Sequence, residues 1–329
     1  MKRLSLILLS AVCVAFGAAP APAQDKYPSK PVKIIVPYAP GGATDIVARV
    51  LGEQLRQITG QTFVVENKPG AFGIIATEEM VRSKPDGYTL MIGNVSTNAI
   101  TPILFAKKYV INYEKDVTPV MRLVDIPEFL IVTTTNFAPK TANELIEYGK
   151  KNSGKLRYGT VGAGSYPHFD MALFAKRASL DMIAIHNKAG ASGIINDMIT
   201  GDTQTAFLNV ASTASMVKAG KLLPIAVVND KRLPDYPDVP TMKEIGFDGV
   251  GTSAWQGLFA PSGTPNDVLE TLRTAVLKAM EADAVKVAFA KQHFGIVPTK
   301  SADEATKWLA GEIGNWKKIT QEVKIEIAN

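Results

Sequence analysis

The chain has few of the residues that reactive and metal-binding sites use most. It contains one cysteine, Cys13, and three histidines, His168, His186 and His293, among 329 residues. Because Cys13 lies in an N-terminal segment that we expect to be removed, the mature protein should have neither a disulfide nor a thiol nucleophile. No two histidines stand at the spacing typical of zinc ligands. We therefore expect no metal site and no cofactor.

Signatures of hydrolases and nucleotide-binding proteins are also missing. There is no G-x-S-x-G elbow and no Walker A lysine pattern, and the glycines at 159, 162 and 164 lack the G-x-G-x-x-G order. Ser165 and His168 are close enough in sequence to suggest a secreted hydrolase with a nucleophile and its base. We favour the alternative, a ligand-binding hydroxyl beside a histidine at a helix start. The chain is therefore not expected to be an enzyme.

Blocks of like charge are absent as well. The formal net charge is +5, or +3 without Lys2 and Arg3, and the basic residues are scattered except for short pairs such as Lys107-Lys108. This distribution argues against binding to nucleic acid. A mild positive balance is compatible with an anionic ligand.

Residues 1–23 have the features of a secretory signal peptide. Lys2 and Arg3 precede an apolar run over 4–18, and Ala21-Pro22-Ala23 provides small residues for cleavage. The apolar run is too short to span a membrane comfortably. Lipidation of Cys13 is disfavoured, because Val12 stands where a small residue is expected. We predict cleavage after Ala23 and export to the periplasm.

The stretch from Ile34 to Asp45 has the pattern of a strand, a glycine turn and a helix start. Ile34 to Val36 is a β-branched run, and Gly41-Gly42 allow the backbone to turn tightly. Thr44 or Asp45 is predicted to cap the helix that follows. The free N–H groups and the positive dipole end of such a helix suit a carboxylate or a phosphate. The alternative is an ordinary turn between a strand and a helix of an α/β domain.

Strands, turns and helices continue to alternate along the chain. Because β-α-β units form parallel sheets whose carboxyl ends meet at one edge, we expect the polar loops that follow the strands to lie close together. A second glycine loop, at 161–168, mirrors the first. Strands are predicted at 33–36, 63–66, 89–93, 119–124, 129–132, 156–160, 182–185, 205–208, 223–228 and 255–260, with a polar loop at 94–98.

The change of pattern between the strands at 119–124 and 129–132 indicates a crossing between two lobes. We predict that residues 24–124 and 254–329 form domain I and that residues 125–253 form domain II. Two lobes joined by two crossings suggest a ligand cleft that closes about a hinge.

Several segments resemble, in order, the Bug/TctC family of substrate-binding receptors of tripartite tricarboxylate transporters. They are "YPSKPVKIIVPYAPGGATDIVAR", "VENKPGAFGIIA", "SKPDGYTLMIGNVSTNAI", "GKLRYGTVGAGSYPHFDMALF", "DYPDVPTMKEIGF" and "WQGLFAPSGTP". The resemblance implies a type II periplasmic-binding-protein fold, with two α/β lobes and mostly parallel sheets around a ligand cleft. It also implies a small organic carboxylate as ligand, held by backbone N–H groups and water, and membrane permease subunits as partners. We expect a monomer; a sensory receptor that docks to a membrane-bound regulator is the alternative.

Two departures from the family pattern fall on domain II. Lys188 replaces the usual aromatic residue if Gly190 keeps its place, and Leu208 stands where an acid often precedes Asn209. These changes predict a more positive wall and a ligand with a second anionic group. The predicted ligand-binding residues are Tyr38, Ala39, Gly41, Gly42, Ala43, Thr44, Asp45, Asn94, Ser96, Thr97, Gly164, Ser165, His168, Lys188, Gly190 and Asn209.

Overall fold

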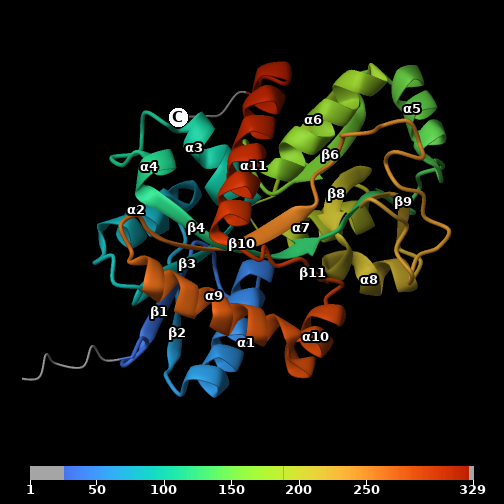
Figure 1. Ribbon diagram of the computed structural model, residues 1–329. Helices are drawn as coiled ribbons and strands as arrows, with labels where there is room; N and C mark the ends of the chain where they lie inside the picture. The colour runs from blue at the N-terminus through green and yellow to red at the C-terminus, as the bar shows by residue number, and fades with distance from the viewer. Residues whose placement is uncertain (1–25, 188, 326–329) are drawn as a thin grey trace, which may run out of the picture.

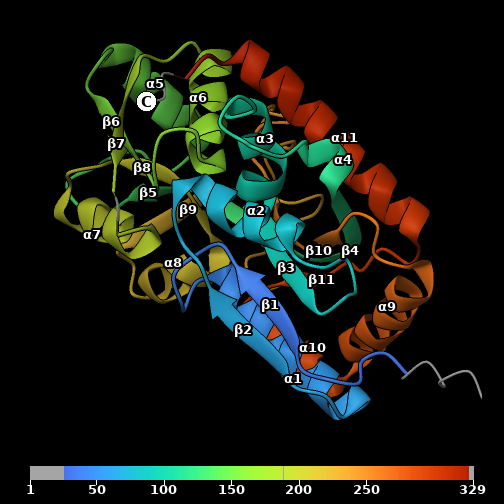
Figure 2. The same cartoon turned by 90° about the vertical axis from the view of Figure 1, so that its left-hand side faces the viewer.

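The computed structural model describes residues 26–187 and 189–325. The predicted signal peptide and Lys188 lie outside this part of the chain. The described residues form two sheets with their helices, which appear as two lobes in Figure 1 and, turned by 90°, in Figure 2. None of the helices in the described ranges is long and apolar enough to cross a membrane.

The first sheet has six strands in the order β11-β4-β10-β3-β1-β2. Its strands are β1 (Val32–Val36), β2 (Phe63–Asn67), β3 (Thr89–Asn94), β4 (Val117–Ile126), β10 (Ala254–Pro261) and β11 (Gly295–Ile296). The helices that belong to it are α1 (Ala43–Thr59), η1 (Ala71–Gly73), α2 (Ile74–Arg82), η2 (Ser96–Ile100), α3 (Thr101–Leu104), α4 (Tyr113–Asp116), α9 (Asn266–Glu281), α10 (Asp283–Ala290) and α11 (Ala302–Glu322).

The second sheet has five strands in the order β7-β6-β8-β5-β9. They are β5 (Glu128–Thr133), β6 (Leu156–Thr160), β7 (Met182–His186), β8 (Thr205–Asn209) and β9 (Leu222–Val228). Helices α5 (Ala142–Lys151), α6 (Tyr166–Ala178), α7 (Ala191–Thr200) and α8 (Val210–Lys218) accompany this sheet.

The prediction of mostly parallel sheets needs a correction, because both sheets are mixed. Strand β1 is parallel to β2 and β3, and β6 is parallel to β7 and β8. Strand β10, however, runs antiparallel to β3 and β4, and β5 runs antiparallel to β8 and β9. The reason is that the chain changes sheet directly at β4–β5 and again before β10, without the helical crossover that a parallel connection requires.

Local expectations were wrong at two places. The segment expected to be a loop at 94–98 is the end of β3 followed by η2, a π-helical turn. Helix α1 begins at Ala43 with Gly42 as its N-cap residue, so Thr44 and Asp45 lie in the first turn and do not cap it. Helix α5 has a side-chain cap, since the hydroxyl of Thr141 accepts a hydrogen bond from the N–H of Glu144 at 3.2 Å.

Candidate functional site

The β1–α1 loop presents backbone donors at the carboxyl end of β1. Ala39, Gly41 and Gly42 are exposed, and Gly41 has φ +89°, a conformation that favours glycine. Within the described chain, the N–H groups of Gly42 and Ala43 make no hydrogen bond, as is usual in the first turn of a helix. These donors and the helix dipole make this loop suitable for an anion.

Asp45 holds this loop in shape rather than facing solvent. Its carboxylate accepts hydrogen bonds from the Gly41 N–H at 2.9 Å, from Asn67 Nδ2 at 2.9 Å and from Arg49 Nε at 2.9 Å. Desolvation acts to raise the pKa of Asp45, but the hydrogen bonds from Arg49, Gly41 and Asn67 outweigh it and leave the pKa below its usual value. The N–H of Gly41 is therefore already taken by the protein.

Thr44 is also turned inward, since its hydroxyl donates to Gln256 Oε1 of β10 at 2.8 Å. Both Thr44 and Asp45 are 3% exposed. Their side chains fix the start of α1 against neighbouring elements, and the predicted role in ligand binding falls to the backbone of the loop.

Tyr38 and Asn94 connect the ends of two strands. The Tyr38 hydroxyl donates to Asn94 Oδ1 at 2.6 Å, and the same oxygen accepts from the N–H groups of Ser96 at 3.0 Å and Thr97 at 3.3 Å. Burial raises the pKa of Tyr38, so its hydroxyl stays protonated. The structure therefore brings the predicted residues of the β1–α1 loop and of the 94–97 segment together at one edge of the first sheet.

The second glycine loop lies at the carboxyl end of β6. Ser165 Oγ donates to the Gly162 carbonyl at 2.7 Å and lies 3.1 Å from Thr160 Oγ1. His168 is in the first turn of α6, which begins at Tyr166, earlier than predicted, and its Nδ1 accepts from the Gly164 N–H at 3.4 Å. The two side chains thus bond to backbone groups instead of to each other, so the geometry gives no support to a nucleophile–base pair.

His168 is an uncharged donor at neutral pH. Burial, with a smaller contribution from His186, lowers its pKa to about 4. The rings of the two histidines are edge to face, with centroids 5.0 Å apart. Because Nδ1 accepts from Gly164, the proton of the neutral imidazole resides on Nε2.

The remaining predicted residues follow β7 and β8, the two neighbours of β6. Gly190 precedes α7 and has φ +72°. In the turn before it, the Asn187 side chain accepts a hydrogen bond from the Ala189 N–H at 2.9 Å. Asn209 ends β8 and is partly exposed. The parallel register of β6 with β7 and β8 brings these loops to one edge of the second sheet. Lys188 is not among the described residues, so its predicted role stays a prediction.

Two buried carboxyl groups that the sequence did not predict, those of Glu128 and Asp170, lie close to this same edge. Glu128, 1% exposed, accepts hydrogen bonds on Oε1 from the Tyr166 hydroxyl at 2.7 Å and from Asn209 Nδ2 at 2.8 Å. Asp170 accepts from the N–H and hydroxyl of Thr252 at 2.9 and 2.8 Å. The wall therefore has a carboxyl group beside Asn209, supplied by the neighbouring strand β5. In the sequence, Glu128 could have been found as an acid within the apolar run Ile126-Pro127-Glu128-Phe129.

Burial makes the carboxyl groups of Glu128 and Asp170 weaker acids than usual. It raises the pKa of Glu128 well above its usual value, helped by the nearby Asp170, and it raises the pKa of Asp170 to about 7. Each lies by a chain crossing between the sheets: Glu128 follows the β4–β5 crossing, and Thr252, the partner of Asp170, precedes β10. Across 26–187 and 189–325, no group of three or more potential metal-ligating side chains is found.

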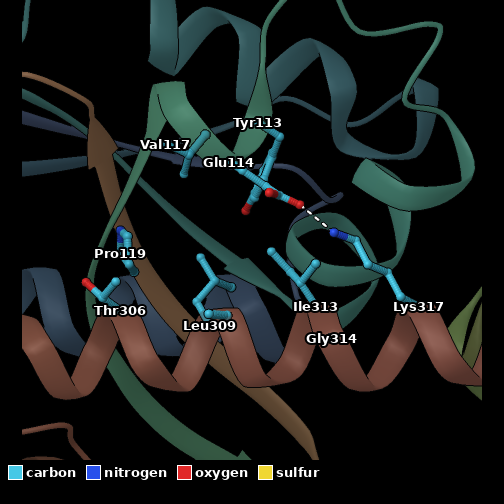
Figure 3. Close-up of a pocket in the computed structure, with 10 residues that line it drawn as sticks. Tyr113, Glu114, Val117, Pro119, Thr306, Leu309, Ile313, Gly314 and Lys317 are labelled. Atoms are coloured by element: carbon cyan, nitrogen blue, oxygen red, sulfur yellow. Dashed lines mark hydrogen bonds and ion pairs between the residues drawn. The ribbon is translucent and has the colours of Figure 1, made fainter.

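A pocket of about 280 Å³ lies elsewhere, between α11 and the α4–β4 segment. Figure 3 shows Leu309 and Ile313 of α11 facing Val117 and Tyr113, while Lys317 reaches Glu114 at one end. The Lys317–Glu114 ion pair is 2.8 Å long and exposed. None of the predicted ligand-binding residues lines this pocket.

Comparison with known proteins agrees with the resemblance. The family described as "Tripartite tricarboxylate transporter family receptor" matches residues 47–325. Protein BugT of Bordetella pertussis is 30% identical over 323 residues, which are 98% of each chain.

Solved structures with the same fold include ligand-bound proteins. An R. palustris protein solved with adipate has a TM-score of 0.81 at 28% identity, covering 91% of this chain and 99% of its own. MatC from Rhodopseudomonas palustris with bound malate has a TM-score of 0.78 at 27% identity, covering 89% and 99%. Together with the two lobes described above, these matches show that the chain belongs to the TctC/Bug family of periplasmic solute-binding receptors.

Proposed function

We propose that this protein is a periplasmic receptor that captures a small organic carboxylate between its two lobes and delivers it to the permease subunits of a tripartite transporter. The observation that carries the proposal is the β1–α1 loop, where the N–H groups of exposed Gly42 and half-buried Ala43 make no hydrogen bond within the described chain. The adipate and malate bound to two related structures support a carboxylate ligand. The division at 124/125 and 253/254 is part of this proposal, since lobe closure requires hinges there.

In this proposal, each lobe supplies one half of the site. The first lobe contributes Tyr38, Asn94 and the N–H groups near Gly42, and the second contributes Ser165, the uncharged donor His168 and Asn209. The N–H groups at the start of α1 and the neutral donor His168 would bind the carboxylate without a paired arginine, and Asn209 would contact the rest of the ligand.

A thermal-shift panel of carboxylates on the mature chain, starting at Gln24, tests the proposal. A ligand at 100 times its dissociation constant should stabilise the native state by about 2.7 kcal/mol. The amides and methyl esters of each hit are the matched controls, because they keep its shape and remove its charge. Equal shifts by acids and their amides would refute recognition of the carboxylate.

Lys188 provides a separate test of the second anionic group. If its ammonium pairs with that group, Lys188→Ala should weaken binding of a dicarboxylate more than binding of the matching monocarboxylate. Lys151→Ala, at an exposed residue that ends α5, is the control for general loss of positive charge. Unchanged affinity of Lys188→Ala for every carboxylate would eliminate this role.

A further inference from the structure

The buried carboxyl group of Glu128 accepts hydrogen bonds on only one of its two oxygens within the described chain. Both of its donors, the Tyr166 hydroxyl and Asn209 Nδ2, bind the same oxygen, Oε1. The other oxygen, Oε2, is buried and has no hydrogen-bond partner among the described residues. Such a carboxyl group is costly to bury, so its retention beside the proposed site calls for a role there.

The two donors come from the loops that form the second half of the proposed site. Tyr166 directly follows Ser165, and Asn209 ends β8, in register with Glu128 across the β5–β8 pair. Tyr166 also packs against the core cluster of the first lobe, which places this group where the lobes meet.

The hydrogen bond to Glu128 determines which end of the Asn209 amide remains available. Nδ2 donates one of its two hydrogens to Glu128, which directs Oδ1 away from that carboxyl group, and Oδ1 makes no hydrogen bond to another described residue. Asn209 is partly exposed, and its Oδ1 is not among the buried polar atoms that lack a partner. This oxygen can therefore accept a hydrogen bond from a ligand.

We propose that Glu128 is a positioning residue that sets ligand specificity. By fixing Nδ2 of Asn209, it makes this part of the wall an acceptor of hydrogen bonds, so the site favours carboxylates that also carry a hydroxyl or ammonium donor. The inference rests on the proposed function and deepens it.

The orientation of Asn209 is compatible with both the ionised and the neutral form of Glu128. Burial and the nearby Asp170 raise the pKa of Glu128, which favours the neutral acid. The proton of that acid can reside on Oε2, and Oε1 then accepts from Asn209 and Tyr166 as it does in the carboxylate.

The test uses pairs of acids that differ by one hydroxyl: propionate and lactate, succinate and malate, glutarate and 2-hydroxyglutarate. Titration calorimetry on the mature wild-type chain should give at least about fivefold tighter binding of the hydroxy acid in the pairs that bind, because a ligand without a hydroxyl covers Oδ1 and leaves it without a donor. In Glu128→Leu, the Asn209 amide can rotate, and the ratio should fall towards one. Glu128→Gln, whose Oε1 still accepts, should retain the ratio.

Two further variants separate this role from a structural one. Asp170→Asn makes the same acid-to-amide change at a buried carboxyl group that bonds Thr252 instead of Asn209, so the ratio should stay at the wild-type value. Asn209→Leu removes the acceptor itself and tests the inference even if Glu128→Leu does not fold. A wild-type ratio near one, or a ratio that survives in Asn209→Leu, overturns the inference and leaves the proposed function standing. Absence of binding by every carboxylate overturns both.

Discussion

At the scale of single residues, Asp170 makes the stability of the protein depend on pH. Burial raises its pKa from 3.8 to about 7, so the native state binds this proton more tightly than the unfolded chain does. Stability should therefore fall as pH rises from about 4 to 7, by up to about 1.4 kcal/mol for each pH unit from this one group. Asp170→Asn can keep both bonds to Thr252 without a charge.

Urea unfolding of the wild type and Asp170→Asn between pH 4 and 8 measures this effect. The variant should lose the contribution of this group to the pH dependence and should be the more stable protein at pH 8. If Asp170→Asn is destabilised by the same amount at both ends of the range, Asp170 is ionised in the native state and the prediction is wrong.

Asp45 differs from Asp170 in that hydrogen bonds from Gly41, Asn67 and Arg49 keep its carboxylate ionised, and through them it supports the β1–α1 loop. Asp45→Ala removes the acceptor of the Gly41 N–H and of Asn67, which should destabilise the protein by about 1–3 kcal/mol and lower carboxylate affinity at least about tenfold. Glu53→Ala, in the exposed pair with Arg56 on the same helix, is the control and should leave stability almost unchanged. Unaltered affinity in Asp45→Ala would show that the loop keeps its shape without this carboxylate.

At the scale of elements, the sequence was most informative where local patterns determine the structure. The strand, glycine turn and helix from Val32 to Thr59 were predictable, because β-branched residues, glycines and helical periodicity agree there. The loops at the carboxyl ends of β1 and β6 were predictable for the same reason, whereas the segment after β3 forms η2 instead of the expected loop.

Other features depend on partners distant in sequence. The antiparallel positions of β5 and β10 depend on where the chain changes sheet, and the bond between Glu128 and Asn209 joins residues 81 positions apart. Burial of Glu128 and Asp170 follows from the packing of whole elements, and local residue patterns carry no direct signal for it.

At the scale of elements, two glycine-to-alanine substitutions should change the stability of the protein in opposite directions. Gly311 lies exposed in the middle of α11 with open space where a Cβ would stand, so Gly311→Ala should stabilise the protein by about 0.5–1 kcal/mol. Gly73 has φ +85°, and an added Cβ would lie 2.3 Å from Thr97 Cγ2, so Gly73→Ala should cost more than about 1 kcal/mol. Thermal melts of both variants test this, and a stable Gly73→Ala would mean that η1 and η2 are not tightly packed.

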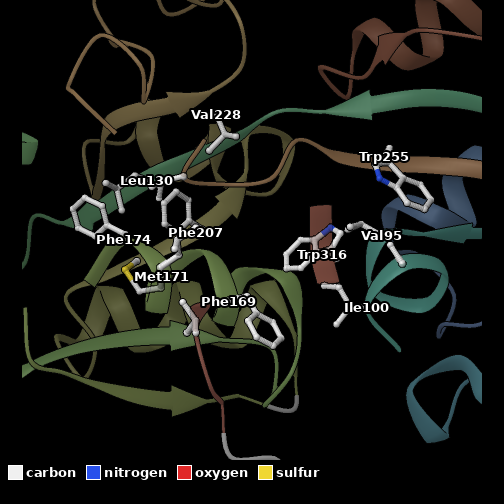
Figure 4. Close-up of a cluster of buried hydrophobic side chains, with 14 of the residues drawn as sticks. Val95, Ile100, Leu130, Phe169, Met171, Phe174, Phe207, Val228, Trp255 and Trp316 are labelled. Carbon is white, nitrogen blue, oxygen red and sulfur yellow. The ribbon is translucent and has the colours of Figure 1, made fainter. Parts of the chain in front are cut away.

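At the scale of the whole molecule, α11 joins the two lobes. It packs on β4 of the first lobe and on α6 of the second, and in Figure 1 it runs beside α6. Figure 4 shows Trp316 and Phe169 between buried side chains of the second lobe, such as Phe207, and of the first, such as Val95. The rings of Trp316 and Phe169 meet edge to face with centroids 5.8 Å apart, and Lys176 Nζ donates to the Glu322 carbonyl at 2.6 Å.

This arrangement predicts that Trp316 couples the unfolding of the lobes. Trp316→Ala should cost about 3–5 kcal/mol and split a single cooperative transition into two, because each lobe has a core cluster of its own and the cluster that holds Trp316 and Phe169 spans both lobes. Trp316→Phe, which keeps an aromatic edge against Phe169, should lose less stability and retain one transition. Urea unfolding followed by circular dichroism distinguishes these results. If Trp316→Ala still unfolds in one step with a loss below about 1 kcal/mol, the coupling must lie in the two chain crossings instead.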